Sequence, residues 1–296
     1  MRSLRVFFLG SLVACGTTTG AEPLQDGGSA ADASDACGPV PGRSPEEGPD
    51  PTATCVKQVT GRLVDDAGMP LPKVNVTVCG NACFGALTDD TGAFRARPRA
   101  LLPAGAYVVF AHARPRHGSV LLPMPARLAE NVDLGTLEAP ALAPEAAALP
   151  SDGAPASTVR VGALSLAVPA GVSWELSFED ATDDVDGRLL RIAKVPPNRA
   201  PAFAAGAALV FALAPFDAKA SKPIALRIDD TGGLAAGAPV EIVVMDGLSL
   251  SPPNTGGLPK VVAKGHVSDD GASIVTDPGE GVQHLTWIAV RPATAN

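Results

Sequence analysis

The chain has 296 residues, enough for one large domain or two ordinary ones, and its formal net charge at pH 7 is −8. An acidic surface is poorly suited to binding nucleic acid phosphates, so we expect no nucleic acid partner. Glycine (31) and proline (29) are frequent and aromatic residues make up only 4%, a composition that indicates short strands and many turns rather than a helical bundle.

The first fifteen residues predict export. Arg2 and Arg5 precede an uncharged apolar run at residues 6–14, which is too short for a ~30 Å hydrocarbon layer that needs about 20 helical residues. We therefore predict a cleaved signal, residues 1–14, whose removal leaves 21 basic residues against 31 acidic ones, a net charge of −10.

The end of this signal, LVAC at residues 12–15, resembles the bacterial lipobox. The resemblance implies cleavage just before Cys15 and a diacylglyceryl group on its sulfur, so that the chain is held at a membrane. Gly16 stands where an aspartate retains some lipoproteins in the inner membrane, which favours the outer membrane or the cell surface. The alternative is an ordinary secretory signal with an incidental cysteine.

Four other cysteines remain, and an exported chain meets an oxidising compartment that favours disulfides. Four cysteines allow three pairings. We favour Cys37–Cys55 and Cys79–Cys83, because each pair brackets a local turn-rich segment, although spacing alone does not select one pairing. A zinc site is the competing interpretation, but it has one close cysteine pair and no histidine before His112. We expect no metal and no cofactor.

Residues 15–55 consist mainly of Gly, Ala, Asp, Pro, Ser and Thr. Such a segment buries too little surface to offset its chain entropy, so it predicts a flexible tether. A Cys37–Cys55 bridge would make its far half a loop pinned near the first domain.

From residue 56 the pattern becomes alternating. Strands are expected at 59–64, 74–78, 105–111 and 132–137, with turn residues at 65–68 and 88–92. Short strands separated by Gly, Pro and Asp indicate an antiparallel β-sandwich over residues 56–138.

Four segments in this region, VTGRLVDDAGMPLPKVNVTV, TDDTGAF, AGAYVVFAHA and VDLGTLE, resemble the carboxypeptidase regulatory-like domain. That family is a transthyretin-like sandwich of about seven strands found in exported bacterial proteins. The resemblance implies support or binding and no catalytic residues. It also implies hairpin and core roles for Gly61, Gly68, Pro70, Thr88, Asp89, Gly92 and Phe94.

Residues 139–157 form an Ala/Pro linker, where we place a domain boundary. Pro144 and Pro150 confine any helix at 145–149 to about one turn.

Alternating runs then continue over residues 158–294 and predict a second β-sandwich, with strands at 158–168, 173–178, 189–195, 208–212, 224–228, 240–245, 261–267, 273–276 and 283–290. LSLAVPAGV, SKPIALRI and LAAGAPVEIVVMD distantly resemble the β-sandwich domain first known from tight-junction scaffolds and netrin receptors. The predicted fold is therefore all-β, two antiparallel sandwiches after a signal peptide and a disordered tether.

Catalytic motifs are missing from the sequence. The four histidines, at positions 112, 117, 266 and 284, accompany neither a Gly-x-Ser-x-Gly turn nor a His-Glu-x-x-His motif. We therefore expect no enzyme and no catalytic residue. The Asp-rich run 179–187 departs from the helix–loop–helix calcium pattern, which leaves an irregular loop site as an alternative to a solvated turn.

One basic cluster suggests anion binding. It consists of His112, Arg114, Arg116 and His117. If the strands around residues 95 and 110 are neighbours, five arginines face one end of the first sandwich and suit an acidic polysaccharide or lipid phosphate. The alternative is a solvated loop. Trp174 and Trp287 fit core-facing positions, which argues against an aromatic platform for neutral sugars.

Together these observations predict a non-catalytic surface lipoprotein. Its sandwiches would serve binding or structural support in the cell envelope, with an envelope protein or a polysaccharide as partner. A glycan-binding or adhesin-type module is the alternative, and an accessory or degenerate enzyme is the third hypothesis.

Overall fold

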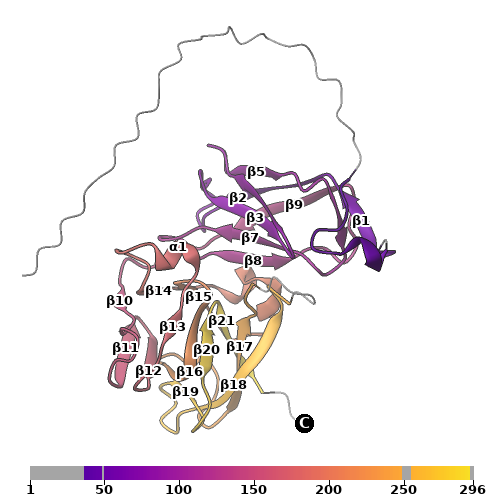
Figure 1. The fold of residues 1–296 in the computed structure, drawn as a ribbon. Coiled ribbons are helices and arrows are strands. Elements are labelled where there is room, and N and C mark those ends of the chain that lie inside the picture. The colour runs from indigo at the N-terminus through magenta and orange to yellow at the C-terminus, as the bar shows by residue number, and fades with distance from the viewer. Residues whose placement is uncertain (1–36, 49, 249–254, 294–296) are drawn as a thin grey trace, which may run out of the picture. The chain divides into compact units, whose positions relative to one another are not determined.

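A computed structural model of the protein describes residues 37–48, 50–248 and 255–293, and every statement below refers to these ranges. Almost all of the regular elements in them are β-strands (Figure 1), as the sequence predicted. The strands before residue 140 are β1 (Ala53–Val56), β2 (Gln58–Val64), β3 (Asn75–Cys79), β4 (Cys83–Leu87), β5 (Ala93–Ala96), β6 (Ala100–Pro103), β7 (Val108–His112), β8 (Val120–Pro123) and β9 (Asn131–Glu138).

The later strands are β10 (Ala147–Ala148), β11 (Ser157–Val161), β12 (Leu164–Val168), β13 (Trp174–Glu175), β14 (Leu189–Lys194), β15 (Leu209–Ala214), β16 (Ala218–Ile228), β17 (Pro239–Met245), β18 (Pro259–Val267), β19 (Ile274–Thr276), β20 (Val282–Leu285) and β21 (Ile288–Pro292). The helical elements are α1 (Phe178–Ala181) and the 3-10 turns η1 (Pro45–Glu47), η2 (Pro197–Arg199) and η3 (Ala202–Ala204).

Two sheets of the first part form a sandwich. One has the order β5-β2-β9 and the other β4-β3-β7-β8. Alternate residues of both sheets, such as Val59 and Leu63 of β2 and Val76 and Val78 of β3, are fully buried in one apolar core. The pairs are antiparallel except β2 with β9, which run parallel. We call this part the first sandwich.

Residues 37–48 and 50–55, in the far half of the expected tether, are ordered against the first sandwich. β1 pairs with β6 in antiparallel register, and the Gly38 N–H donates to the Arg99 carbonyl oxygen at 2.9 Å. Val56 is fully buried. This differs from the flexible tether predicted for these residues, because the Cys37–Cys55 disulfide closes the segment and lowers the entropy lost on ordering it.

The second part is one long sheet in the order β10-β14-β15-β21-β17-β18-β19-β16-β12-β11, with β13 and β20 also paired to β16. Residues from both ends and from the middle of this order share a second apolar core. The sheet must therefore curve around that core, as strand twist allows. The eleven-residue β16 helps, because its first half pairs with β13 and β20 and its last residues with β12 and β19.

Three central strands of this sheet, β15, β17 and β21, are buried on both faces. In β15, Leu209, Phe211 and Leu213 lie in the second core, whereas Val210 and Ala212 lie in the core of the first sandwich. β17 and β21 alternate in the same way. One face of the second sheet thus packs against the first sandwich, and the described residues from Cys37 onward form a single compact unit.

Residues 139–157, the expected linker, pack against the neighbouring strands. Ala139, Leu142 and Leu149 are buried, and the Ala143 N–H donates to the Ile192 carbonyl oxygen at 2.9 Å. The sequence allowed at most one helical turn at residues 145–149, but the structure has the short strand β10 there, paired with β14. Extended residues at this position gain hydrogen-bond partners from β14. The structure does not separate two domains at this segment.

Candidate functional site

Two disulfides join the four cysteines that the structure describes. Cys37 bonds to Cys55 and Cys79 bonds to Cys83, with Cα atoms 5.6 and 4.1 Å apart. This is the pairing that the cysteine spacing favoured. The second disulfide closes the β3–β4 hairpin, where the two cysteines are partners in register. Cys15, the predicted lipid attachment site, lies outside the described residues.

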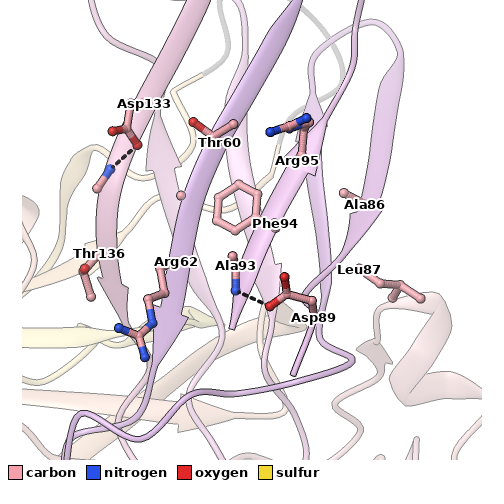
Figure 2. A pocket seen from close by; sticks show the side chains of 12 residues that line it. Thr60, Arg62, Ala86, Leu87, Asp89, Ala93, Phe94, Arg95, Asp133 and Thr136 are labelled. Atoms are coloured by element: carbon pink, nitrogen blue, oxygen red, sulfur yellow. Dashed lines mark hydrogen bonds between the residues drawn. The ribbon is translucent and has the colours of Figure 1, made fainter. Parts of the chain in front are cut away.

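An open hollow of about 750 Å³ lies against the first sandwich (Figure 2). Its lining comes from β2, β4, β5 and β9 and from the turn after β4, and we call it the sheet hollow. It is lined by Thr60, Gly61, Arg62, Ala86, Leu87, Asp89, Ala93, Phe94, Arg95, Asp133, Gly135 and Thr136.

Most of the charged groups in the sheet hollow stabilise turns. Asp89 accepts hydrogen bonds from the side chain and backbone of Thr91, which lower the pKa of its carboxyl. Asp133 accepts the Gly135 N–H within β9 at 3.0 Å, and the Arg62 Nε donates to the Thr91 carbonyl oxygen at 2.9 Å. Arg95 is exposed and has no hydrogen bond or ion pair from its side chain to any described residue. The Arg95 guanidinium in the sheet hollow is therefore uncompensated by any carboxylate of the described residues.

Arg114, the first of the basic residues in the predicted anion site, is already paired with acid. Its Nε lies 2.8 Å from the Asp180 Oδ1 and its Nη2 2.7 Å from the Asp183 Oδ2. Asp180 is only 5% exposed, and burial raises the pKa of its carboxyl while Arg114 opposes that rise. Arg114 thus fixes α1 to the loop after β7 and is not available to a ligand.

His112 lies between the two parts of the fold, with its ring centroid 3.6 Å from that of Phe110. Burial lowers the pKa of the imidazole below its ordinary value; Glu179 opposes this shift and Arg114 adds to it. This shift disfavours the charged imidazolium, and the ring packs against Phe110.

The expected patch of five arginines does not form. β5, which carries Arg95, belongs to the three-stranded sheet, and β7 belongs to the four-stranded one. Arg97 and Arg99 lead into β6, which pairs with β1, whereas Arg114 is bound to α1. The condition for that patch, that the strands around residues 95 and 110 are neighbours, is not met in the sheet order, because sequence proximity does not show which sheet a strand joins.

Arg116 and His117 do share a hollow, of about 550 Å³. We call it the junction hollow, because its lining joins the loop after β7, the 141–144 segment and β14. It is lined by Pro115, Arg116, His117, Ala141, Leu142, Ala143, Pro144, Asp186 and Arg191. Arg191 was not among the predicted residues; it donates to Asp186 at 2.8 Å and to the Pro144 carbonyl oxygen at 2.9 Å.

The Asp-rich run weighed as a calcium loop is organised by arginines instead. Ser177 caps α1 by accepting the Asp180 N–H, and the carboxylates that follow are bound by Arg114 and Arg191. A Cβ added at Gly187 would lie 1.9 Å from the Asp180 carbonyl oxygen, so the turn closes tightly on a glycine. Within the described ranges, no three His, Cys, Asp or Glu side chains gather as a metal site.

Asp217 is a perturbed group that sequence reasoning missed. One carboxylate oxygen, Oδ1, is buried with no hydrogen-bond partner among the described residues, and a Cβ added at Gly247 would lie 2.1 Å from it. Burial raises the pKa of this carboxyl to about 6, against the lowering effects of Lys219 and the Leu248 N–H. No local pattern marks Asp217, because its neighbours come from distant strands.

The tryptophans and the tyrosine of the chain are all buried. Trp287 donates its ring N–H to the Ser119 carbonyl oxygen at 2.7 Å, and Trp174 lies in the second core. Tyr107 is 1% exposed. The core-facing prediction for both tryptophans is confirmed, and none of the three rings offers a platform for a sugar.

Comparison of the sequence with models of known protein families and with curated proteins gave no match. Across the part of the chain that the structure describes, no helix has the length and apolar character needed to cross a membrane.

Proposed function

We propose that this chain is an exported, non-catalytic lipoprotein, anchored through a lipid on Cys15 and displaying its β-structure for binding or structural support in the cell envelope. The observation that supports the anchor is the cysteine pairing. The four described cysteines bond to one another, so none of them is a disulfide partner for Cys15. Cys15 ends the LVAC sequence that resembles a lipobox, and Gly16 favours an outer-membrane or surface destination.

We further propose that the first sandwich is a carboxypeptidase regulatory-like domain. Its three-stranded and four-stranded sheets around one core are what a transthyretin-like sandwich of about seven strands requires. Gly92, one of the residues implied to shape a hairpin, has φ +77°, and a Cβ there would lie 2.3 Å from the Leu63 carbonyl oxygen. A backbone role for Gly92 fits that proposal.

Metabolic labelling tests the anchor. The full chain and its Cys15→Ala variant would be expressed in a Gram-negative bacterium fed a radiolabelled fatty acid, followed by membrane fractionation. We expect label and membrane attachment in the wild type and neither in Cys15→Ala. A double variant in which Cys37 and Cys55 become Ala is the matched control, and it should keep its label. Persistent labelling of Cys15→Ala would overturn the proposal.

A further inference from the structure

We propose that the junction hollow binds an acidic sugar, with its carboxylate or phosphate held by Arg116, His117 and Arg191. This inference goes beyond the lipid anchor and does not depend on it. Its first support is that these three residues line one hollow although they come from two distant parts of the chain.

The charge in the hollow is unbalanced. Arg191 is paired with Asp186 at 2.8 Å, and both side chains are about one-quarter exposed or less. Arg116 is exposed, and its guanidinium has no ion pair or hydrogen bond with any residue in the described ranges. Two arginines therefore face one carboxylate, which leaves one uncompensated cation for an anionic ligand.

One of the two arginines is positioned before any ligand binds. Arg191 donates from Nη1 to the Pro144 carbonyl oxygen and from Nη2 to Asp186, so two hydrogen bonds hold its guanidinium in place. A planar guanidinium held in place loses little freedom when it binds a carboxylate or phosphate. Arg114, by contrast, has both ends of its fork occupied by acids, so it adds nothing here.

The remaining wall of the hollow suits the body of a sugar. Five of its lining residues are apolar: Pro115, Ala141, Leu142, Ala143 and Pro144. A volume of about 550 Å³ exceeds what a bare inorganic anion fills, whereas it is in the range of small-molecule sites. Apolar walls with a few convergent polar groups are the usual composition of such sites.

Titration of the full chain, purified in detergent, with glucuronate and glucose 6-phosphate tests the inference, with glucose as the uncharged probe. Calorimetry or NMR would report the affinities. We expect at least one acidic sugar to bind and glucose not to bind. Arg116→Ala should weaken the acidic sugar on the order of tenfold, whereas Arg97→Ala, an exposed arginine outside the hollow, should leave the affinity unchanged.

A galacturonate oligomer in the same titration distinguishes a polymer from a free sugar as the source of the ligand, and either source supports the inference. Equal binding of glucose, absence of binding by both acidic sugars, or an affinity that ignores Arg116→Ala would overturn it. The Arg116 side chain is exposed and makes no hydrogen bond or ion pair with any described residue, so the variant should keep its circular dichroism spectrum and remain interpretable. None of these outcomes bears on lipid attachment.

Discussion

Replacing Asp217 with asparagine should stabilise the protein at neutral pH. The carboxylate is mostly buried, its Oδ1 has no partner in the described part of the chain, and a Cβ added at Gly247 would lie 2.1 Å from that oxygen. Burial is the largest cause of a pKa raised from 3.8 to about 6. Asparagine has the same shape and tolerates the positive φ of 61° at this position, so the change removes the charge and little else.

The raised pKa of Asp217 determines how its carboxyl affects stability at each pH. A carboxyl whose pKa is higher in the folded state than in the unfolded state favours folding below pH 3.8, and this contribution is lost as the pH rises through about 6. A shift of this size corresponds to about 3 kcal/mol as an upper bound, and to about 1–2 kcal/mol once solvent screening is included. Asp217→Asn should therefore exceed the wild type in stability at pH 7.5 and match it near pH 4.

Urea unfolding of both proteins at these two pH values, followed by tryptophan fluorescence, measures the difference. Asp90→Asn is the matched control, because Asp90 is exposed and should show no change at either pH. A wild type that is the more stable protein at pH 7.5 would refute the argument, since the ionised carboxylate would then be making a favourable contact.

Three further changes probe the packing. Arg114→Ala should lower the free energy of unfolding by about 3 kcal/mol, because it leaves the buried Asp180 unpaired; Arg116→Ala should change it by less than about 0.5 kcal/mol. Trp287→Phe should cost about 1–3 kcal/mol more than Trp174→Phe, because only the former ring N–H has an acceptor in the described ranges. Replacing both cysteines of the first disulfide with serine, which opens a loop of sequence separation 18, should cost about 3 kcal/mol. Urea denaturation checks each value. Equal losses for Arg114→Ala and Arg116→Ala, or for Trp287→Phe and Trp174→Phe, would contradict the corresponding prediction.

Alternation in the sequence was sufficient to find the strands that have one buried face. β2, β3 and β9 fall within or close to the expected ranges, because each turns every second residue toward a core. β4, β6 and β8 were not predicted. β4 is an edge strand without a buried residue, so it shows no alternation of apolar and polar residues from which a strand could be predicted.

The points at which two expected strands are interrupted could not be predicted from alternation. The expected strand 173–178 shortens to β13, because Ser177 caps α1 and the chain turns there. The expected strand 283–290 divides into β20 and β21 around Thr286, whose hydroxyl donates to the Met245 carbonyl oxygen. Both interruptions depend on tertiary contacts.

The candidate site was predicted only in part, for the same reason. Arg116 and His117 do line a hollow, but Arg114 is bound by carboxylates 66 and 69 residues further along the chain. Arg191 also lines this hollow, where it donates a hydrogen bond to the Pro144 carbonyl oxygen of the 141–144 segment. Sequence shows which residues are charged, and the pairing of strands decides which charges remain free.

The first disulfide also decides how the folded part responds to mechanical load. Any tension applied from the N-terminal side enters at Cys37 and crosses the sulfur bridge to Cys55 in β1. The covalent path through the bridge is shorter than the path along the intervening chain, so the bridge is the connection that tightens first. Cys55 lies opposite Leu101 in the antiparallel β1–β6 pair. The load therefore falls on β1, at the middle of its ladder with β6 and next to the buried Val56, rather than on a free strand end.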